Sequence, residues 1–223
     1  MPNKQSLMSN SQILWEAYDQ FLLPLGGKKV PTPYRRNEVG SFQKLGPEFQ
    51  GKSSPEVLTQ TTKKLAKEQN FDLNKASMEE IREFMKQNKL GIDCSGFVYR
   101  MLNSLVQKVK GKSLEGFGFP HVGRTNVDRL TSDEFSIKIP DFDQIKPGDL
   151  VRLDSKALDG VPHCVIVLDH QDKIITYAHS TRQTNPNGVH MGQIIEGKFT
   201  ADLKVFLYNL GDGDGIRRLK ILV

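Results

Sequence analysis

The first half of the chain carries hydrophobic residues near helical spacing, interrupted by short polar segments. Ser54 stands before Pro55, which suits a first helical turn, and Ser77 begins a capping-box sequence, SMEE. The Pro- and Gly-rich segment PLGGKKVPTPYRRN (24–37) is predicted to be a loop. The periodic pattern predicts helices over residues 10–23, 54–69, 77–88 and 94–109.

The pattern changes after Ile137. Short runs rich in β-branched residues are separated by Gly, Asp, Asn and Pro, which is typical of strands joined by turns. Helices followed by mostly antiparallel strands indicate an α+β fold rather than alternating β-α-β units. The predicted strands lie in DQIKPGDLVRL, HCVIVLD, KIITYAHS, HMGQIIE, KVFLYNL and RRLKILV.

Composition favours a folded globular protein. Of the 223 residues, 37% are hydrophobic and 26% are charged, so disorder is not the default expectation. No apolar run approaches the ~20 residues that span a bilayer, so we expect no membrane span. The start, MPNKQSLMSNSQILW, has no apolar signal-peptide core. We therefore expect a cytoplasmic protein, one exported without a signal, or one whose leader has been removed.

The chain is basic, with a net charge of +5. Such a charge favours anionic surroundings such as nucleic acid, acidic lipid or cell-wall polymer. The Lys and Arg residues are scattered, however, and no nucleic-acid motif accompanies them. We therefore predict a solvated basic surface and no nucleic-acid partner.

Cys94 begins the last predicted helix, in the sequence GIDCSGFVYRML (91–102). Asp93 is placed to cap that helix, and the partial positive charge at a helix start favours a thiolate over a thiol. Gly96 removes side-chain bulk one turn from the thiol, where a substrate backbone would then fit. The alternative interpretation is a buried structural thiol, because free cysteines are commonly small core residues.

A nucleophilic cysteine needs a base, and the base needs an orienting partner. His163 begins one predicted strand and His179 ends the next, and the turn HQDK makes these ends neighbours in a hairpin. If both side chains share a face, His163 can accept the thiol proton while His179 holds its imidazole. Cys164 follows His163, and side-chain alternation directs it to the opposite face as a core residue.

The other three histidines are predicted to lie outside this group. His170 is expected in the exposed hairpin turn, His121 in a loop, and His190 in a strand with a structural role. Two cysteines without CxxC spacing form neither a disulfide framework nor a zinc motif, and a reduced state is expected. A metal site remains the alternative for the histidine pair with a cysteine, but no HxH or HxxxH pair supports it. We predict no metal and no cofactor.

Four segments together resemble the NlpC family of papain-like cysteine peptidases and amidases. The similar segments are DCSGFV (93–98) at the nucleophile, RTNVD (124–128) after the catalytic helix, IKPGDLVRL (145–153), and the histidine hairpin HCVIVLD…YAHS (163–180). The resemblance implies a papain-like core in which a catalytic helix packs on a mostly antiparallel sheet. This catalytic core would comprise residues 91–223, with an N-terminal helical extension, residues 1–90, packed on it.

The resemblance also implies catalytic roles. Cys94 would be the nucleophile, His163 the general base and then acid, and His179 the orienting residue. These three residues occur in the order that the family shows.

Substrate-binding roles follow from the same resemblance. Tyr34, in TPYRRN, would correspond to an active-site tyrosine, although two predicted helices separate it from the DCSG box, which departs from the family. Asp93 and Ser95 would help to bind the free amine of a cell-wall peptide. Helix capping explains the presence of Asp93 equally well. An ordinary position in the first helical turn explains the presence of Ser95 equally well.

The expected activity is cysteine hydrolysis of amide bonds in bacterial cell-wall (peptidoglycan) peptides, next to γ-D-glutamyl or diaminopimelate residues. One alternative is the same chemistry, as hydrolysis or acyl transfer, on a lipid or protein amide. Another is a catalytically inactive binding module of the same fold. A wall amidase delivered by a contact-dependent machine would also have an immunity protein as a partner.

Overall fold

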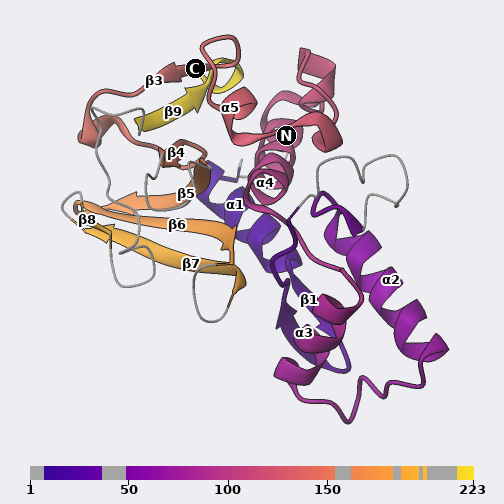
Figure 1. The fold of residues 1–223 in the computed structure, drawn as a ribbon. Helices are drawn as coiled ribbons and strands as arrows, with labels where there is room; N and C mark the ends of the chain where they lie inside the picture. Colours follow the sequence, from indigo (N-terminus) through magenta and orange to yellow (C-terminus); the bar gives the residue numbers. More distant parts are fainter. Residues whose placement is uncertain (1–7, 37–48, 154–161, 183–186, 196–197, 200–214) are drawn as a thin grey trace, which may run out of the picture.

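A computed structural model describes residues 8–36, 49–153, 162–182, 187–195, 198–199 and 215–223. Within these ranges the protein has an α+β fold with a seven-stranded sheet, a two-stranded sheet and five α-helices. Figure 1 shows the large sheet on one side, a small hairpin with two helices on the other, and two helices between them. The expected α+β class is confirmed.

The four predicted helices are confirmed with small shifts at their ends. Ser54 caps α2, Ser77 caps α3 through a capping box, and Asp93 caps α4. A short further helix, α5, begins at Val127 within the RTNVD segment and ends beyond it at Leu130. The helices are α1 (Asn10–Gln20), α2 (Pro55–Glu68), α3 (Met78–Gln87), α4 (Cys94–Lys110) and α5 (Val127–Leu130).

The loop predicted over residues 24–37 is partly wrong, because much of it forms a β-hairpin. Strands β1 (Leu22–Leu25) and β2 (Lys28–Pro31) pair antiparallel around Gly26 and Gly27. Both glycines have positive φ, 56° and 72°. A Gly-Gly pair with this backbone forms the tight turn that suits the twist of a two-residue hairpin.

The seven-stranded sheet is antiparallel throughout, in the order β3-β9-β4-β5-β6-β7-β8. Five of the six predicted strands are confirmed, and KVFLYNL (204–210) lies outside the described residues. Strands β3 and β8 were not predicted. The strands are β3 (Ser136–Lys138), β4 (Leu150–Leu153), β5 (His163–Gln171), β6 (Ile174–Thr181), β7 (Gly188–Ile195), β8 (Lys198–Phe199) and β9 (Gly215–Leu219).

Three hydrophobic clusters hold these elements together. The first joins α1 and α4 to one face of the sheet, and includes Cys164 and Ile166 of β5. The second lies on the other face, around Val165 and Tyr177. The third joins the β1–β2 hairpin to α2 and α3. Helix α1 thus shares a core with α4 and β5, although it lies in the first 90 residues.

No helix in the described part of the chain combines the length and the hydrophobicity needed to cross a membrane.

Candidate active site

The start of α4 places Cys94 at the first helical residue. The Asp93 carboxylate accepts a hydrogen bond from the Gly96 N–H at 2.6 Å, and the Asp93 carbonyl accepts one from Phe97. Cys94 is half-buried, whereas Cys164 is fully buried. This half-buried cysteine therefore lies at the positive end of a helix.

A β-bulge determines that His163 and His179 lie on the same face of the sheet. Next to the hairpin turn at Asp172 and Lys173, Gln171 is opposite Ile174. The register shifts by one residue between Val167 and Asp169. Beyond this shift, Ile166 is opposite Ala178. The shift of one residue moves side chains to the other face. Without it, the pairing set by the turn would direct the two histidines to opposite faces.

Three histidines form a continuous hydrogen-bonded chain across β5, β6 and β7. His163 Nε2 lies 2.8 Å from His179 Nδ1, and His179 Nε2 lies 2.9 Å from His190 Nε2. His190 Nδ1 lies 2.9 Å from the Gly188 carbonyl oxygen. His190 is directly opposite His179 in the β6–β7 pairing. The purely structural role predicted for His190 is therefore incomplete, because its ring directly contacts the predicted orienting residue.

The Gly188 carbonyl fixes which nitrogen of each neutral imidazole carries the proton. A carbonyl can only accept, so His190 donates from Nδ1 and its Nε2 accepts from His179. His179 then accepts at Nδ1, so His163 donates from Nε2. The Nδ1 nitrogen of His163 is left as the basic site of the chain.

His179 stays neutral in this chain. Its pKa lies well below the usual value because the ring is completely buried, and because His163 and His190 would repel a positive charge. A neutral His179 can accept the proton of His163, which is the role of an orienting residue.

Cys94 is activated by its neighbours. Hydrogen bonds from the side chains of Cys164 and His163, together with the charges of His163 and Lys52, hold the pKa of Cys94 well below its usual range. Cys164, which is buried beside a thiolate, has its pKa raised. Cys164 belongs to the hydrophobic core as predicted, but its hydrogen bond to Cys94 was not foreseen.

Asp93 and Ser95 are both buried, and they bind a lysine of the same chain. Lys52 Nζ donates to Asp93 Oδ1 at 2.8 Å and to Ser95 Oγ at 2.6 Å. Ser95 Oγ donates in turn to Asp93 Oδ1 at 3.2 Å. Burial raises the pKa of Asp93 to about 6, although the Lys52 ammonium opposes the rise. Nothing in the sequence pattern marked Lys52 as part of this site.

Gly96 allows a backbone approach, but the approaching backbone belongs to the protein itself. A Cβ built on Gly96 would overlap the carbonyl oxygen of Gly51 and lie 3.1 Å from Lys52 Cδ. The Gly51 carbonyl accepts a hydrogen bond from the Asp93 N–H at 2.9 Å. The interpretation of Gly96 as space for a substrate backbone is therefore wrong, because that space holds residues 51 and 52.

Replacing Gly96 by alanine is expected to lower the free energy of unfolding by about 1–3 kcal/mol, because the new methyl group would displace the Gly51 backbone. Urea unfolding followed by circular dichroism measures the change. Gly116→Ala is the matched control, since a Cβ there meets its nearest atom, Lys112 Cβ, at 3.4 Å. Equal stability of the two variants would show that the Gly51–Gly96 contact is unimportant.

Tyr34 lies beside the start of α4 despite its distance in sequence. It forms a parallel bridge with Ile92, and the Ile92 N–H donates to the Pro33 carbonyl at 3.0 Å. Burial raises the pKa of Tyr34, and the negative charges of Cys94 and Asp93 raise it further. The tyrosine and the DCSG box are therefore adjacent in space, although residues 49–90, with α2 and α3, lie between them in the sequence.

The remaining two histidines bind backbone groups outside the three-histidine chain. His170 belongs to strand β5 rather than to the hairpin turn, so its prediction as a turn residue is wrong, and its Nδ1 lies 3.0 Å from the Ile145 carbonyl oxygen. His121 precedes a short 3-10 helix and accepts a hydrogen bond from the Gly123 N–H. Each ring is thus bonded to a backbone group rather than to the three-histidine chain.

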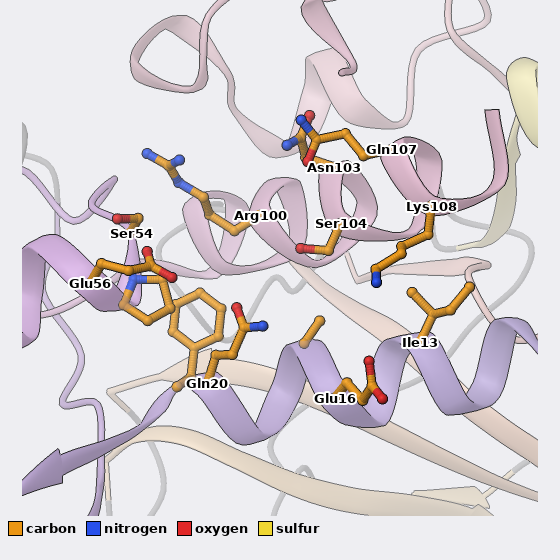
Figure 2. A pocket seen from close by; sticks show the side chains of 13 residues that line it. Ile13, Glu16, Gln20, Ser54, Glu56, Arg100, Asn103, Ser104, Gln107 and Lys108 are labelled. Carbon is orange, nitrogen blue, oxygen red and sulfur yellow. The ribbon is translucent and has the colours of Figure 1, made fainter. Parts of the chain in front are cut away.

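A separate polar cleft lies between α1, α4 and the start of α2. Figure 2 shows Glu16, Gln20, Arg100 and Lys108 among the side chains around it. Its lining contains neither Cys94 nor any histidine. The chemistry of the cysteine and the histidines is therefore not located in this cleft.

Comparisons of the chain with known protein families, curated proteins and solved structures found no match. Among the described residues, no group of three or more His, Cys, Asp and Glu side chains is arranged to hold a metal ion. The function proposed below therefore rests on the geometry of this site and on the sequence motifs.

Proposed function

We propose that this protein is a cysteine hydrolase that cleaves amide bonds, with Cys94 as nucleophile, His163 as base and His179 as orienter. The observation that carries the proposal is the hydrogen-bonded series from Cys94 through His163 and His179 to His190. It provides an activated thiol, an imidazole beside it that can act as the base, and a neutral group that fixes the base.

The proposed reaction begins at the thiolate of Cys94. The sulfur attacks the amide carbonyl, and the carbonyl oxygen becomes an oxyanion. The first N–H groups of a helix have no partner inside the helix, so the Cys94 N–H is available to stabilise that oxyanion. His163, which took the thiol proton at Nδ1, then protonates the leaving amine, and an acyl-cysteine remains.

Water completes the reaction. His163 removes a proton from the water molecule, the resulting hydroxide attacks the acyl-cysteine, and the acid product leaves with Cys94 restored as thiolate. During both steps His163 is transiently charged, and its Nε2–H donates to His179. The fully buried His179 keeps the base in one orientation throughout.

A papain-like core of the NlpC type is part of this proposal. Its support is the cysteine at the start of α4, the packing of that helix against an antiparallel sheet, and the histidines on β5 and β6. The motifs DCSGFV and PGDLV and the histidine hairpin favour bacterial cell-wall peptides as substrates. The net charge of +5 is compatible with an anionic wall polymer.

Digestion of purified peptidoglycan and its soluble fragments tests this proposal. We expect new peptide products with the wild-type protein, and their loss in Cys94→Ala, because no other described residue supplies the nucleophile. Mass spectrometry identifies the cleaved bond. His121→Ala, which alters an exposed residue whose ring is bonded to the Gly123 N–H, is the control and should leave the products unchanged.

Two other outcomes separate the alternatives. Hydrolysis of a lipid or protein amide that depends on Cys94, without any action on peptidoglycan, would support the same chemistry on another substrate. Binding of wall fragments with no Cys94-dependent product would contradict hydrolysis and favour an inactive module of this fold.

A further inference from the structure

A buried ammonium group lies directly beside the proposed nucleophile. Lys52 is only 3% exposed, and its Nζ binds Asp93 and Ser95, the residues on either side of Cys94. The Ser95 hydroxyl also donates to Asp93. Together the carboxylate and the hydroxyl form a cation site next to the thiol, and a residue of the same chain occupies it.

The backbone around Lys52 is held in place by other contacts. The Arg100 guanidinium donates to the Lys52 carbonyl from Nε at 3.3 Å and from Nη2 at 2.9 Å. Lys52 also forms a bridge with Ile92, just before the start of α4. The ammonium group is therefore a fixed part of the site rather than the end of a mobile side chain.

Other positive charges act on the same region. Arg36 and Arg182 are exposed, and their charges oppose the rise in the pKa of Tyr34 that burial, Cys94 and Asp93 cause. The charge of Lys52 acts on Cys94 itself. Asp93 carries the carboxylate next to Tyr34 and Lys52, and this carboxylate is already paired with the Lys52 ammonium. A cation that entered the site would therefore meet the Lys52 ammonium at the carboxylate that could otherwise pair with it.

We infer that the substrate of this site carries no free ammonium group beside the scissile bond, and that it is an N-acylated or anionic acyl compound. The inference rests on the proposed function. A substrate ammonium would find the oxygens of Asp93 and Ser95 already bonded to Lys52, and it would face a second positive charge nearby. A neutral amide in its place meets no such repulsion. Free-amine binding by Asp93 and Ser95, which the NlpC resemblance implies, is excluded while Lys52 is in place.

Charged thiol reagents test this inference without a substrate. We would measure rate constants for modification of Cys94 by methanethiosulfonates that carry a methyl, an ethylsulfonate or an ethylammonium group. Each rate is divided by that of the same reagent with a small free thiol, and the modified cysteine is identified by mass spectrometry. At low ionic strength we expect the normalised rate of the anionic reagent to exceed that of the cationic reagent at least about tenfold. Equal normalised rates, or faster reaction of the cation, would overturn the inference.

Two variants connect the selectivity to Lys52. Lys52→Met keeps a long apolar side chain but removes the ammonium, and it should reduce the preference for the anionic reagent severalfold. Lys63→Ala removes an exposed lysine of α2 and should leave the preference unchanged. A preference that persists in Lys52→Met would contradict the inference. The wild-type ratio decides the question if Lys52→Met does not fold.

The same experiment distinguishes failure of the inference from failure of the proposed function. If the neutral reagent modifies Cys94 no faster at about pH 6 than an ordinary thiol, Cys94 is not activated and the hydrolase proposal fails. If the neutral reagent reacts quickly but the cation reacts as fast as the anion, only the inference fails. If the inference holds, peptide substrates with free, acetylated and succinylated amino termini should follow the same order, with the free amine cleaved slowest.

Discussion

Replacing His163 by alanine is expected to lower kcat for amide hydrolysis roughly 10²–10⁴-fold, the usual contribution of a general acid–base residue. His163 is proposed both to take the thiol proton and to give a proton to the leaving amine. Its removal also takes away one of the interactions that lower the pKa of Cys94. Steady-state kinetics on a peptidoglycan fragment or another amide substrate measures the change.

His170→Ala is the matched control for this variant. His170 lies on the same strand, but its ring contacts the Ile145 carbonyl and Phe142 rather than Cys94. It should retain kcat within a few-fold of the wild type. If His163→Ala keeps most of the activity, or if the two variants lose it equally, His163 is not the base.

His190 is expected to have the next largest effect, through the orientation of His179. In His190→Ala the Nε2–H of His179 loses its acceptor, so His179 can move its proton to Nδ1 and no longer accept from His163. We expect kcat to fall about 10-fold or more, with KM nearly unchanged, because His190 is proposed to act through His179 rather than on the substrate. The same variant should slow the modification of Cys94 at neutral pH.

His190→Gln separates orientation from simple packing. Glutamine offers an amide oxygen that can accept the His179 proton, so this variant should recover part of the lost kcat. A merely structural role for His190 would instead give a loss of stability with kcat per folded molecule preserved. Equal losses of kcat in the alanine and glutamine variants would contradict the proposed proton arrangement.

The local features of the fold were predictable from the sequence because local interactions determine them. Ser54, Ser77 and Asp93 cap their helices through their own side chains, and the sequence pattern identified all three helices. The position of Cys94 at a helix start followed directly from Asp93. The β1–β2 hairpin differs from the predicted loop because proline and glycine are typical of both loops and tight turns, and the Gly-Gly pair here forms a tight turn.

The sequence predicted that His163 and His179 lie at neighbouring strand ends, but it did not reveal the strand pairing that brings both side chains to one face. The hairpin turn at residues 172 and 173 was expected, yet the pairing that it sets would separate His163 from His179. The bulge at Leu168 corrects this, and the apolar sequence HCVIVLD has no alternation that would reveal it. The contact between His179 and His190 likewise depends on the pairing of β6 with β7.

Lys52 and Tyr34 show why the surroundings of the nucleophile could not be predicted. Both reach the start of α4 through bridges to Ile92, and these bridges join segments that lie far apart in the chain. No periodicity or spacing in the sequence indicates such contacts. As a consequence, Asp93 and Ser95 were considered as ligands for a substrate amine, whereas in the structure they bind Lys52.

The most direct test of the account is the pH dependence of Cys94 alkylation by iodoacetamide in the wild type and in His163→Ala. Cys164 is kept, because it hydrogen-bonds Cys94, and mass spectrometry identifies the labelled peptide. Since the pKa of Cys94 is lowered, its thiolate should persist below pH 8, so wild-type labelling should stay fast there. In His163→Ala the half-maximal pH should rise by about 1–3 units, the usual effect of losing one opposite charge. Slow labelling with the profile of an ordinary thiol in both proteins would contradict an activated cysteine–histidine pair.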